Sequence, residues 1–162
     1  PGAEFGPAKR WPHYHYAELA KQLIDEGYQV VLFGSAKDHE AGNEILAALN
    51  TEQQAWCRNL AGETQLDQAV ILIAACKAIV TNDSGLMHVA AALNRPLVAL
   101  YGPSSPDFTP PLSHKARVIR LITGYHKVRK GDAAEGYHQS LIDITPQRVL
   151  EELNSLLLQE EA

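Results

Sequence analysis

The sequence predicts a Rossmann-like α/β domain in which a mainly parallel sheet lies between two layers of helices. Short apolar runs rich in β-branched residues alternate with helical segments, and the loops between them are short. The run YQVVLF at residues 28–33 is continuously apolar, as is typical of a parallel strand covered on both faces. With 162 residues, 46% of them hydrophobic and 20% charged, the chain can form one domain with an ordinary core.

Composition narrows the classes of function. A net charge of −5 and a pI near 5.8 argue against non-specific nucleic-acid binding, which needs a basic face. No stretch approaches the roughly 18 apolar residues that a membrane span requires, and none resembles a signal peptide. Cys57 and Cys76 each lie in an apolar segment and are predicted to be buried, reduced thiols of a cytosolic protein. The seven histidines show no ligand spacing, so no metal site is predicted.

The chain opens with a Gly- and Pro-rich loop over residues 1–12, without an initiator methionine and with no strand before it. We therefore expect a cut inside a longer protein. Pro12 is expected to begin a helix over residues 14–26, and Trp11 to fold the loop onto that helix. Lys9 precedes this helix start, where a lysine either reaches a phosphate or stays solvated.

The strand over residues 28–33 ends at Gly34, and a charged segment then leads into a second helix. Ligands of open α/β sheets bind at the carboxyl ends of the strands. Asp38 and Glu40 are therefore candidates for hydrogen bonds to ligand hydroxyls. The alternative is that they are solvated acidic residues favoured by the helix dipole. A weaker strand over residues 56–60 turns at Thr64 into a helix over residues 65–75.

Residues 78–93, AIVTNDSGLMHVAAAL, carry the strongest local signal for a ligand site. A short strand over residues 79–81 meets an alanine-rich helix through a tight turn. The first turn of a helix has unpaired amides and a partial positive charge, which suit a phosphate. Ser84 and Gly85 would present such amides, and the Ser84 hydroxyl either binds phosphate or caps the helix. Asp83 either contacts neutral hydroxyls, such as those of a sugar, or caps the helix.

The remaining elements are strands over residues 97–100 and 116–122 and an amphipathic helix over residues 146–158 that Thr145 caps. Because the strands are parallel, the loops after residues 33, 60, 81 and 100 are expected at one edge of a single sheet. That edge gathers the polar residues named above and is expected to bind a nucleotide.

Four motifs in this order, PGAEFGPAKRWP, LFGSAKDHE, NDSGLMHVAAAL and LVALYGPSSP, resemble the carboxyl-terminal half of the bacterial heptosyltransferases of glycosyltransferase family 9. The resemblance covers essentially the whole chain. It implies the GT-B fold, in which two Rossmann-like halves face each other across a cleft. Residues 1–162 would then be the domain that binds the nucleotide-sugar donor, and the acceptor domain would lie outside this chain.

The resemblance also implies roles for single residues. Lys9, in AKRWP, matches the lysine that contacts the donor phosphates. Asp83, in NDSG, matches the acidic residue that contacts the donor's heptose. Ser84, Gly85 and Leu86 match the turn whose amides meet the pyrophosphate.

Other positions match the family less closely. Asp38 falls where relatives carry a glutamate near the ribose or sugar, and Glu40, two residues on, is the second candidate for that contact. Thr64 lies where the adenine would rest. His88 either helps to hold the phosphate or packs against its own helix.

The reaction that the resemblance implies is inverting transfer of L-glycero-D-manno-heptose from ADP-L-glycero-D-manno-heptose to the inner-core heptose of lipopolysaccharide, without a metal cofactor. Lys9 and the turn amides would stabilise the departing ADP, whereas the general base is expected in the missing domain. The chain alone is thus expected to bind donor without turnover. The acceptor implies a cytoplasmic protein with peripheral contact to the inner membrane. The basic residues 126–130 would contact anionic acceptor phosphates or the membrane surface, unless they form a solvated loop.

Two other classes share these features. A sugar-nucleotide epimerase has the same two-domain fold and phosphate-binding helix, and a non-catalytic nucleotide-binding module needs only the site. A nicotinamide-dependent oxidoreductase is disfavoured, because no G-x-G-x-x-G follows the first strand.

Overall fold

The computed structural model describes residues 1–2, 6–107, 109–123 and 135–161. Helices and strands alternate through most of the chain, as the sequence predicts. The elements are η1 (Pro7–Lys9), α1 (His13–Asp25), β1 (Val30–Leu32), η2 (Ala36–Asp38), α2 (His39–Ala47), α3 (Thr51–Gln54), β2 (Cys57–Asn59), α4 (Leu66–Ala75), β3 (Ile79–Asn82), α5 (Gly85–Ala92), β4 (Leu97–Tyr101), β5 (Ala116–Arg120), α6 (Gln139–Ile142) and α7 (Pro146–Glu161).

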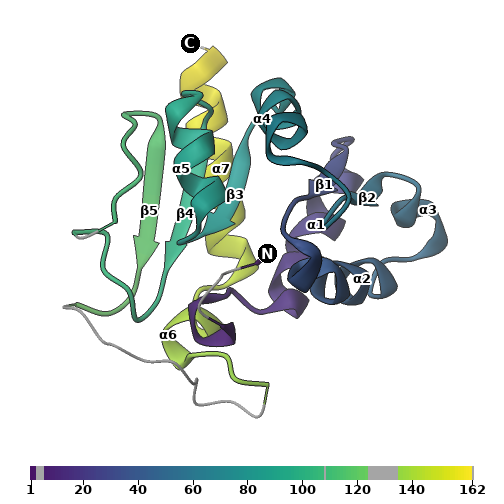
Figure 1. Cartoon of the computed structure of the whole chain (residues 1–162), viewed down its shortest axis with the longest axis horizontal. Coiled ribbons are helices and arrows are strands. Elements are labelled where there is room, and N and C mark those ends of the chain that lie inside the picture. The colour runs from purple at the N-terminus through teal and green to yellow at the C-terminus, as the bar shows by residue number, and fades with distance from the viewer. Residues whose placement is uncertain (3–5, 108, 124–134, 162) are drawn as a thin grey trace.

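The larger sheet has the order β3-β4-β5, and both of its pairings are parallel. Ile79 lies opposite Leu97, which in turn lies opposite Ala116. Helix α5 covers one face and α7 the other (Figure 1), and every residue of β4 is buried. A strand covered on both sides in this way explains the apolar run at residues 97–100. The predicted αβα layering is confirmed for this part of the chain.

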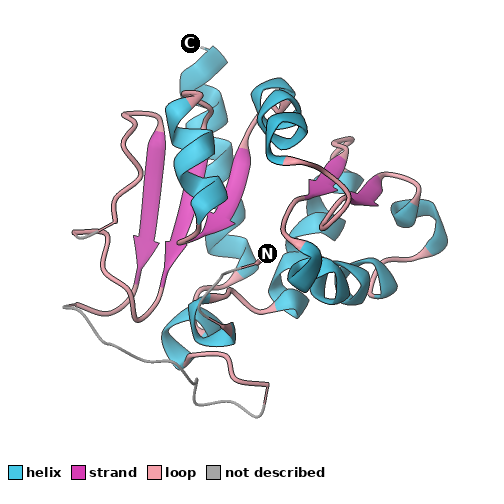
Figure 2. Ribbon diagram, in the orientation of Figure 1, coloured by secondary structure: helices cyan, strands magenta, loops and turns pink. Residues whose placement is uncertain are grey.

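Strands β1 and β2 form a separate, two-stranded parallel sheet (Figure 2). Among the described residues, no ladder joins β1 to β3, so the expectation of a single continuous sheet is wrong for this structure. Strand β1 has only three residues and pairs with β2 along one edge. The residues of β1, together with Ile79 and Val80 of β3, line a cavity between the two sheets. The sheet is divided in two because the edges of β1 and β3 border this cavity and do not pair with each other.

Trp11 connects the opening loop to the carboxyl-terminal part of the chain. Its side chain is 1% exposed and packs edge-on against Tyr16, with ring centroids 4.8 Å apart. The indole Nε1 donates a hydrogen bond to the carbonyl of Ile144 at 2.9 Å. The predicted folding of the loop onto α1 by Trp11 is confirmed, and the indole N–H fixes the loop to the turn before α7 as well.

The helix bounds, the cap of α7 and the state of the cysteines are close to the predictions. Helix α1 begins one residue earlier than expected, and the short helices α3 and α6 were not predicted. The Thr145 hydroxyl accepts a hydrogen bond from the amide of Arg148 at 3.2 Å, as a cap of α7 should. Both cysteines are free thiols, with Cys57 buried and Cys76 half-buried.

In the described part of the chain, no helix has the length and apolar character needed to cross a membrane. The basic residues 126–130 lie outside the described residues.

Candidate functional site

The turn between β3 and α5 leaves the start of α5 without a side-chain cap. Ser84 is the N-cap residue and has extended backbone, but its side chain makes no capping hydrogen bond. Its hydroxyl lies 3.3 Å from the hydroxyl of Thr81. A Cβ atom added at Gly85 would meet nothing within 4 Å, so the space at the helix start is open. Of the two interpretations of Ser84, capping is therefore not the one seen here, and the helix start is accessible to an anion.

Asp83 does not cap the helix either. Its carboxylate accepts a hydrogen bond from the hydroxyl of Thr109 at 3.2 Å. The phenol of Tyr101 donates to the carbonyl of Thr109 and lies 3.2 Å from the sulfur of Met87. Burial raises the pKa of Tyr101, and the negative charge of Asp83 raises it further. The phenol therefore stays a neutral donor that holds the loop after β4 beside the half-buried Asp83.

A cavity of about 1330 Å³ separates the two sheets and reaches the start of α5. Four of the residues predicted to bind donor line it, namely Asp38, Ser84, Gly85 and Leu86. Arg10 also lines it and brings a positive charge to the same space.

The other predicted residues do not line this cavity. Lys9 ends η1 in the residue before Arg10, and Asp83 precedes the N-cap of α5. Glu40 and His88 are exposed, whereas Lys9, Thr64 and Asp83 are half-buried. The structure thus brings together the turn predicted to bind phosphate and the Lys9 loop, whereas Glu40, Thr64 and His88 do not line the cavity. Their contacts with a donor stay predictions.

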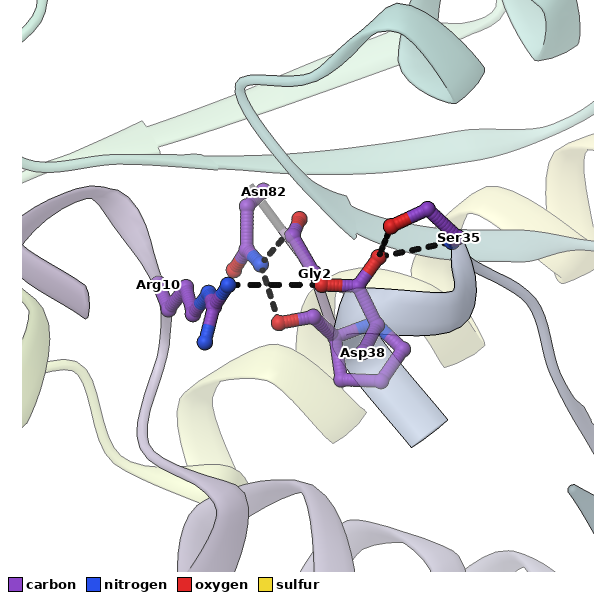
Figure 3. Close-up of polar contacts among 6 residues, drawn as sticks. Gly2, Arg10, Ser35, Asp38 and Asn82 are labelled. Atoms are coloured by element: carbon purple, nitrogen blue, oxygen red, sulfur yellow. Dashed lines mark hydrogen bonds and ion pairs between the residues drawn. The ribbon is translucent and has the colours of Figure 1, made fainter. Parts of the chain in front are cut away.

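The carboxylate of Asp38 is hydrogen-bonded to other residues of the chain (Figure 3). Its Oδ2 accepts from the amide of Ser35 at 2.7 Å and from the Ser35 hydroxyl at 3.0 Å, and its Oδ1 accepts from Nη2 of Arg10 at 3.3 Å. A Cβ atom at Gly34 would come within 2.7 Å of Oδ2, and one at Gly2 within 2.1 Å of Cγ. Asp38 is therefore neither solvated nor free, and here it fixes the loop after β1 to the loop before α1. Its contact with a ribose or sugar stays a prediction.

Asn82, the last residue of β3, is a second buried polar centre and was not among the predicted site residues. It is 0% exposed. Its Oδ1 accepts from the amide of Trp11 at 2.8 Å and from the Tyr16 hydroxyl at 2.9 Å. Its Nδ2 donates to the carbonyls of Pro1 and Gly2 at 3.0 and 3.1 Å (Figure 3). The only sequence signal for Asn82 is an amide residue at the end of a β-branched strand, and this signal does not identify its hydrogen-bond partners.

An open α/β sheet with an uncapped helix start at the carboxyl end of a strand is the arrangement of a phosphate- or nucleotide-binding domain. Comparison with known proteins narrows this class. Residues 1–138 match the family described as glycosyltransferase family 9 (heptosyltransferase), and the chain belongs to that family.

Individual proteins similar to this chain are also named as heptosyltransferases. The chain is 99% identical over its 162 residues to lipopolysaccharide heptosyltransferase 2 of Escherichia coli K12, and it covers 47% of that protein. It is 69% identical over 158 residues, or 97% of the chain, to lipooligosaccharide heptosyltransferase 2 of Haemophilus influenzae and covers 46% of it. A solved structure of ADP-heptose lipopolysaccharide heptosyltransferase II from E. coli superposes with a TM-score of 0.92 and 93% identity, over all of this chain and 46% of that one. The chain thus spans a little under half the length of these relatives.

Proposed function

We propose that this chain is the donor-binding domain of an inverting heptosyltransferase. The donor is ADP-L-glycero-D-manno-heptose, and the acceptor is the inner-core heptose of lipopolysaccharide. Membership of glycosyltransferase family 9 supports the class of reaction, and the names of the relatives support ADP-heptose as donor and lipopolysaccharide as acceptor. An acceptor of this kind places the reaction at the inner face of the inner membrane.

One observation carries the proposal for the donor. The start of α5, at Ser84 and Gly85, is uncapped and opens into a cavity that Arg10 also lines. A diphosphate bound there would accept hydrogen bonds from the first amides of α5, in line with the positive end of the helix dipole. The half-buried Asp83, beside the same turn, is repelled by phosphate and suits neutral sugar hydroxyls.

The proposed chemistry divides between this chain and the acceptor domain. Inverting transfer forms a bond from the acceptor oxygen to the anomeric carbon of the heptose and breaks the bond to ADP. The negative charge that develops on the departing ADP needs fixed positive groups, which are Lys9 and the amides of Ser84 and Gly85. The proton of the acceptor hydroxyl needs a base, which the proposal assigns to the acceptor domain. The scheme uses no metal ion, and the chain alone is expected to bind donor without transferring heptose.

Titration calorimetry on the chain tests the proposal. We expect ADP and ADP-heptose to bind, and UDP-N-acetylglucosamine to bind at least tenfold more weakly. Lys9→Met should weaken ADP binding about tenfold or more, because a charge-assisted hydrogen bond contributes about 1.5–3 kcal/mol. The matched control is Lys21→Met on α1, whose ammonium pairs with Glu18 at 3.8 Å and whose loss should leave the affinity unchanged.

Other outcomes of the titrations would indicate a different class of protein or a different site. A preference for UDP-N-acetylglucosamine would favour the sugar-nucleotide epimerase. A folded chain that binds no nucleotide would refute the donor site, and equal loss of affinity in both lysine variants would refute the role of Lys9.

A further inference from the structure

We propose that Asn82 is a positioning residue, which holds the loop that carries Lys9 in register with the phosphate-binding turn after β3. This inference rests on the proposed donor site. It adds a requirement that the family resemblance does not contain, namely a neutral carboxamide at the end of β3.

The hydrogen bonds of Asn82 fix the orientation of its side-chain amide. The partners of Oδ1 include the backbone N–H of Trp11, which can only donate. Both partners of Nδ2 are backbone carbonyls, of Pro1 and Gly2, which can only accept. The carboxamide thus uses two acceptor and two donor positions at once. A carboxylate of the same shape could accept from Trp11 but would face two carbonyl oxygens with no proton to share.

The positions of these partners connect the two parts of the proposed site. Asn82 is followed directly by Asp83 and then by the N-cap Ser84. Trp11, held by Oδ1, lies two residues after Lys9 in the sequence. One buried side chain therefore sets the distance between the ammonium-bearing loop and the amides at the start of α5.

Two further contacts stabilise this arrangement, one at Asn82 and one at the loop itself. The Tyr16 hydroxyl, from the second turn of α1, donates to Oδ1 at 2.9 Å, and burial raises the pKa of this phenol, so that it remains a donor. Arg10, between Lys9 and Trp11, pairs with Asp38 at 3.3 Å. The loop is thus held by Asn82 of β3 and by Asp38 after β1, and the Tyr16 hydroxyl helps to fix the Asn82 side chain. Of these residues, Asn82 is the one next to the proposed phosphate-binding turn.

A positioning role differs from a merely stabilising one in its coupling to Lys9. If Asn82 acts on phosphate binding through the placement of Lys9, the two substitutions must be non-additive. If Asn82 only stabilises the fold, each substitution changes ADP binding independently or not at all.

The experiment is a double-mutant cycle on the full chain, with ADP as the probe and calorimetry as the measurement. We expect Asn82→Asp to weaken ADP binding about tenfold, comparable to the effect of Lys9→Met. In the Asn82→Asp background, Lys9→Met should cost less than about threefold more, because the ammonium is already displaced. Asn50→Asp, at the exposed N-cap of α3, is the matched control, because it makes the same change of charge outside the cavity and the Lys9 loop. Its ADP affinity should stay within about threefold of the unsubstituted chain.

Folding is checked in parallel by thermal unfolding, and all titrations are made at least 20 °C below each midpoint. Asn82→Ser, which removes the amide without adding a charge, is the second variant and should weaken ADP binding as Asn82→Asp does. Normal ADP affinity in either folded variant, or effects of Asn82 and Lys9 that multiply, would overturn the inference and leave the donor site intact. Failure of both variants to fold would assign Asn82 to folding and also overturn it. Failure of the unsubstituted chain to bind ADP would instead refute the proposed function itself.

Discussion

Asp38→Asn tests whether Asp38 fixes the loop after β1, as the structure shows, or is free to bind ligand. The substitution keeps the shape of the side chain and replaces one oxygen by an NH2 group. Oδ2 faces the N–H of Ser35, and Oδ1 faces the guanidinium of Arg10. Whichever way the new amide turns, its NH2 group therefore meets a donor.

The expected cost follows from these contacts. Hydrogen bonds to a charged group contribute about 1.5–3 kcal/mol each. The substitution removes at least one and weakens the others by neutralising the acceptor. The side chain of Asp38 is 10% exposed and that of Arg10 is 22% exposed, so water compensates part of the loss. We expect the free energy of unfolding to fall by about 3 kcal/mol, and the unfolding midpoint by about 6–12 °C for a chain of this size.

Urea unfolding followed by circular dichroism measures this difference. The matched control is Glu40→Gln, two residues further on and exposed, which should change the free energy of unfolding by less than about 0.5 kcal/mol. A loss below about 1 kcal/mol for Asp38→Asn would refute the reasoning. If that small loss came with weaker ADP-heptose binding, the carboxylate would contact ligand instead, as the family resemblance implies.

Two further predictions concern buried side chains. Trp11→Phe removes the hydrogen bond to Ile144 and part of the buried ring. It should lower the free energy of unfolding, measured in urea, by about 2–3 kcal/mol. The control Trp56→Phe, at a side chain 46% exposed, should change the free energy of unfolding by less than about 0.5 kcal/mol. Equal losses would contradict the anchoring role of Trp11. Burial raises the pKa of Cys57 from 9.0 to about 11, so only about one thiol in a thousand is ionised at pH 8 and iodoacetamide should leave Cys57 unlabelled in the native chain. The stability that depends on this neutral thiol should be lost as pH rises from 9 to 11, and stoichiometric labelling at pH 8, read by mass spectrometry, would contradict the assignment.

Local signals were enough to predict most of the elements and the turn at Ser84. The apolar run at residues 97–100 and the alanine-rich segment after Gly85 are local patterns, so β4 and α5 are found from neighbouring residues alone. The same stretch predicts where α5 begins, although it leaves open whether Ser84 or Asp83 caps the helix. These features depend on interactions within a few residues, which a sequence displays directly.

The partners of Asp38 and Asn82 could not be predicted in this way. Asn82 lies 71 residues from Trp11 and 66 from Tyr16, and Asp38 lies 28 from Arg10. No period or capping rule relates such distant positions. Burial and polarity at the end of a strand indicate that an amide needs partners, but only the folded chain supplies them.

The sequence by itself determined most of the helices and strands, that the strands run parallel, and that a helix begins directly after β3, because hydrophobic period and turn chemistry are local. Only the tertiary structure decided that the strands form two sheets, that Asp38 turns its carboxylate toward Ser35 and Arg10, and that Asn82 joins the Lys9 loop to the turn. The reason is that buried polar groups take whichever donors and acceptors the packing of distant segments brings within about 3 Å.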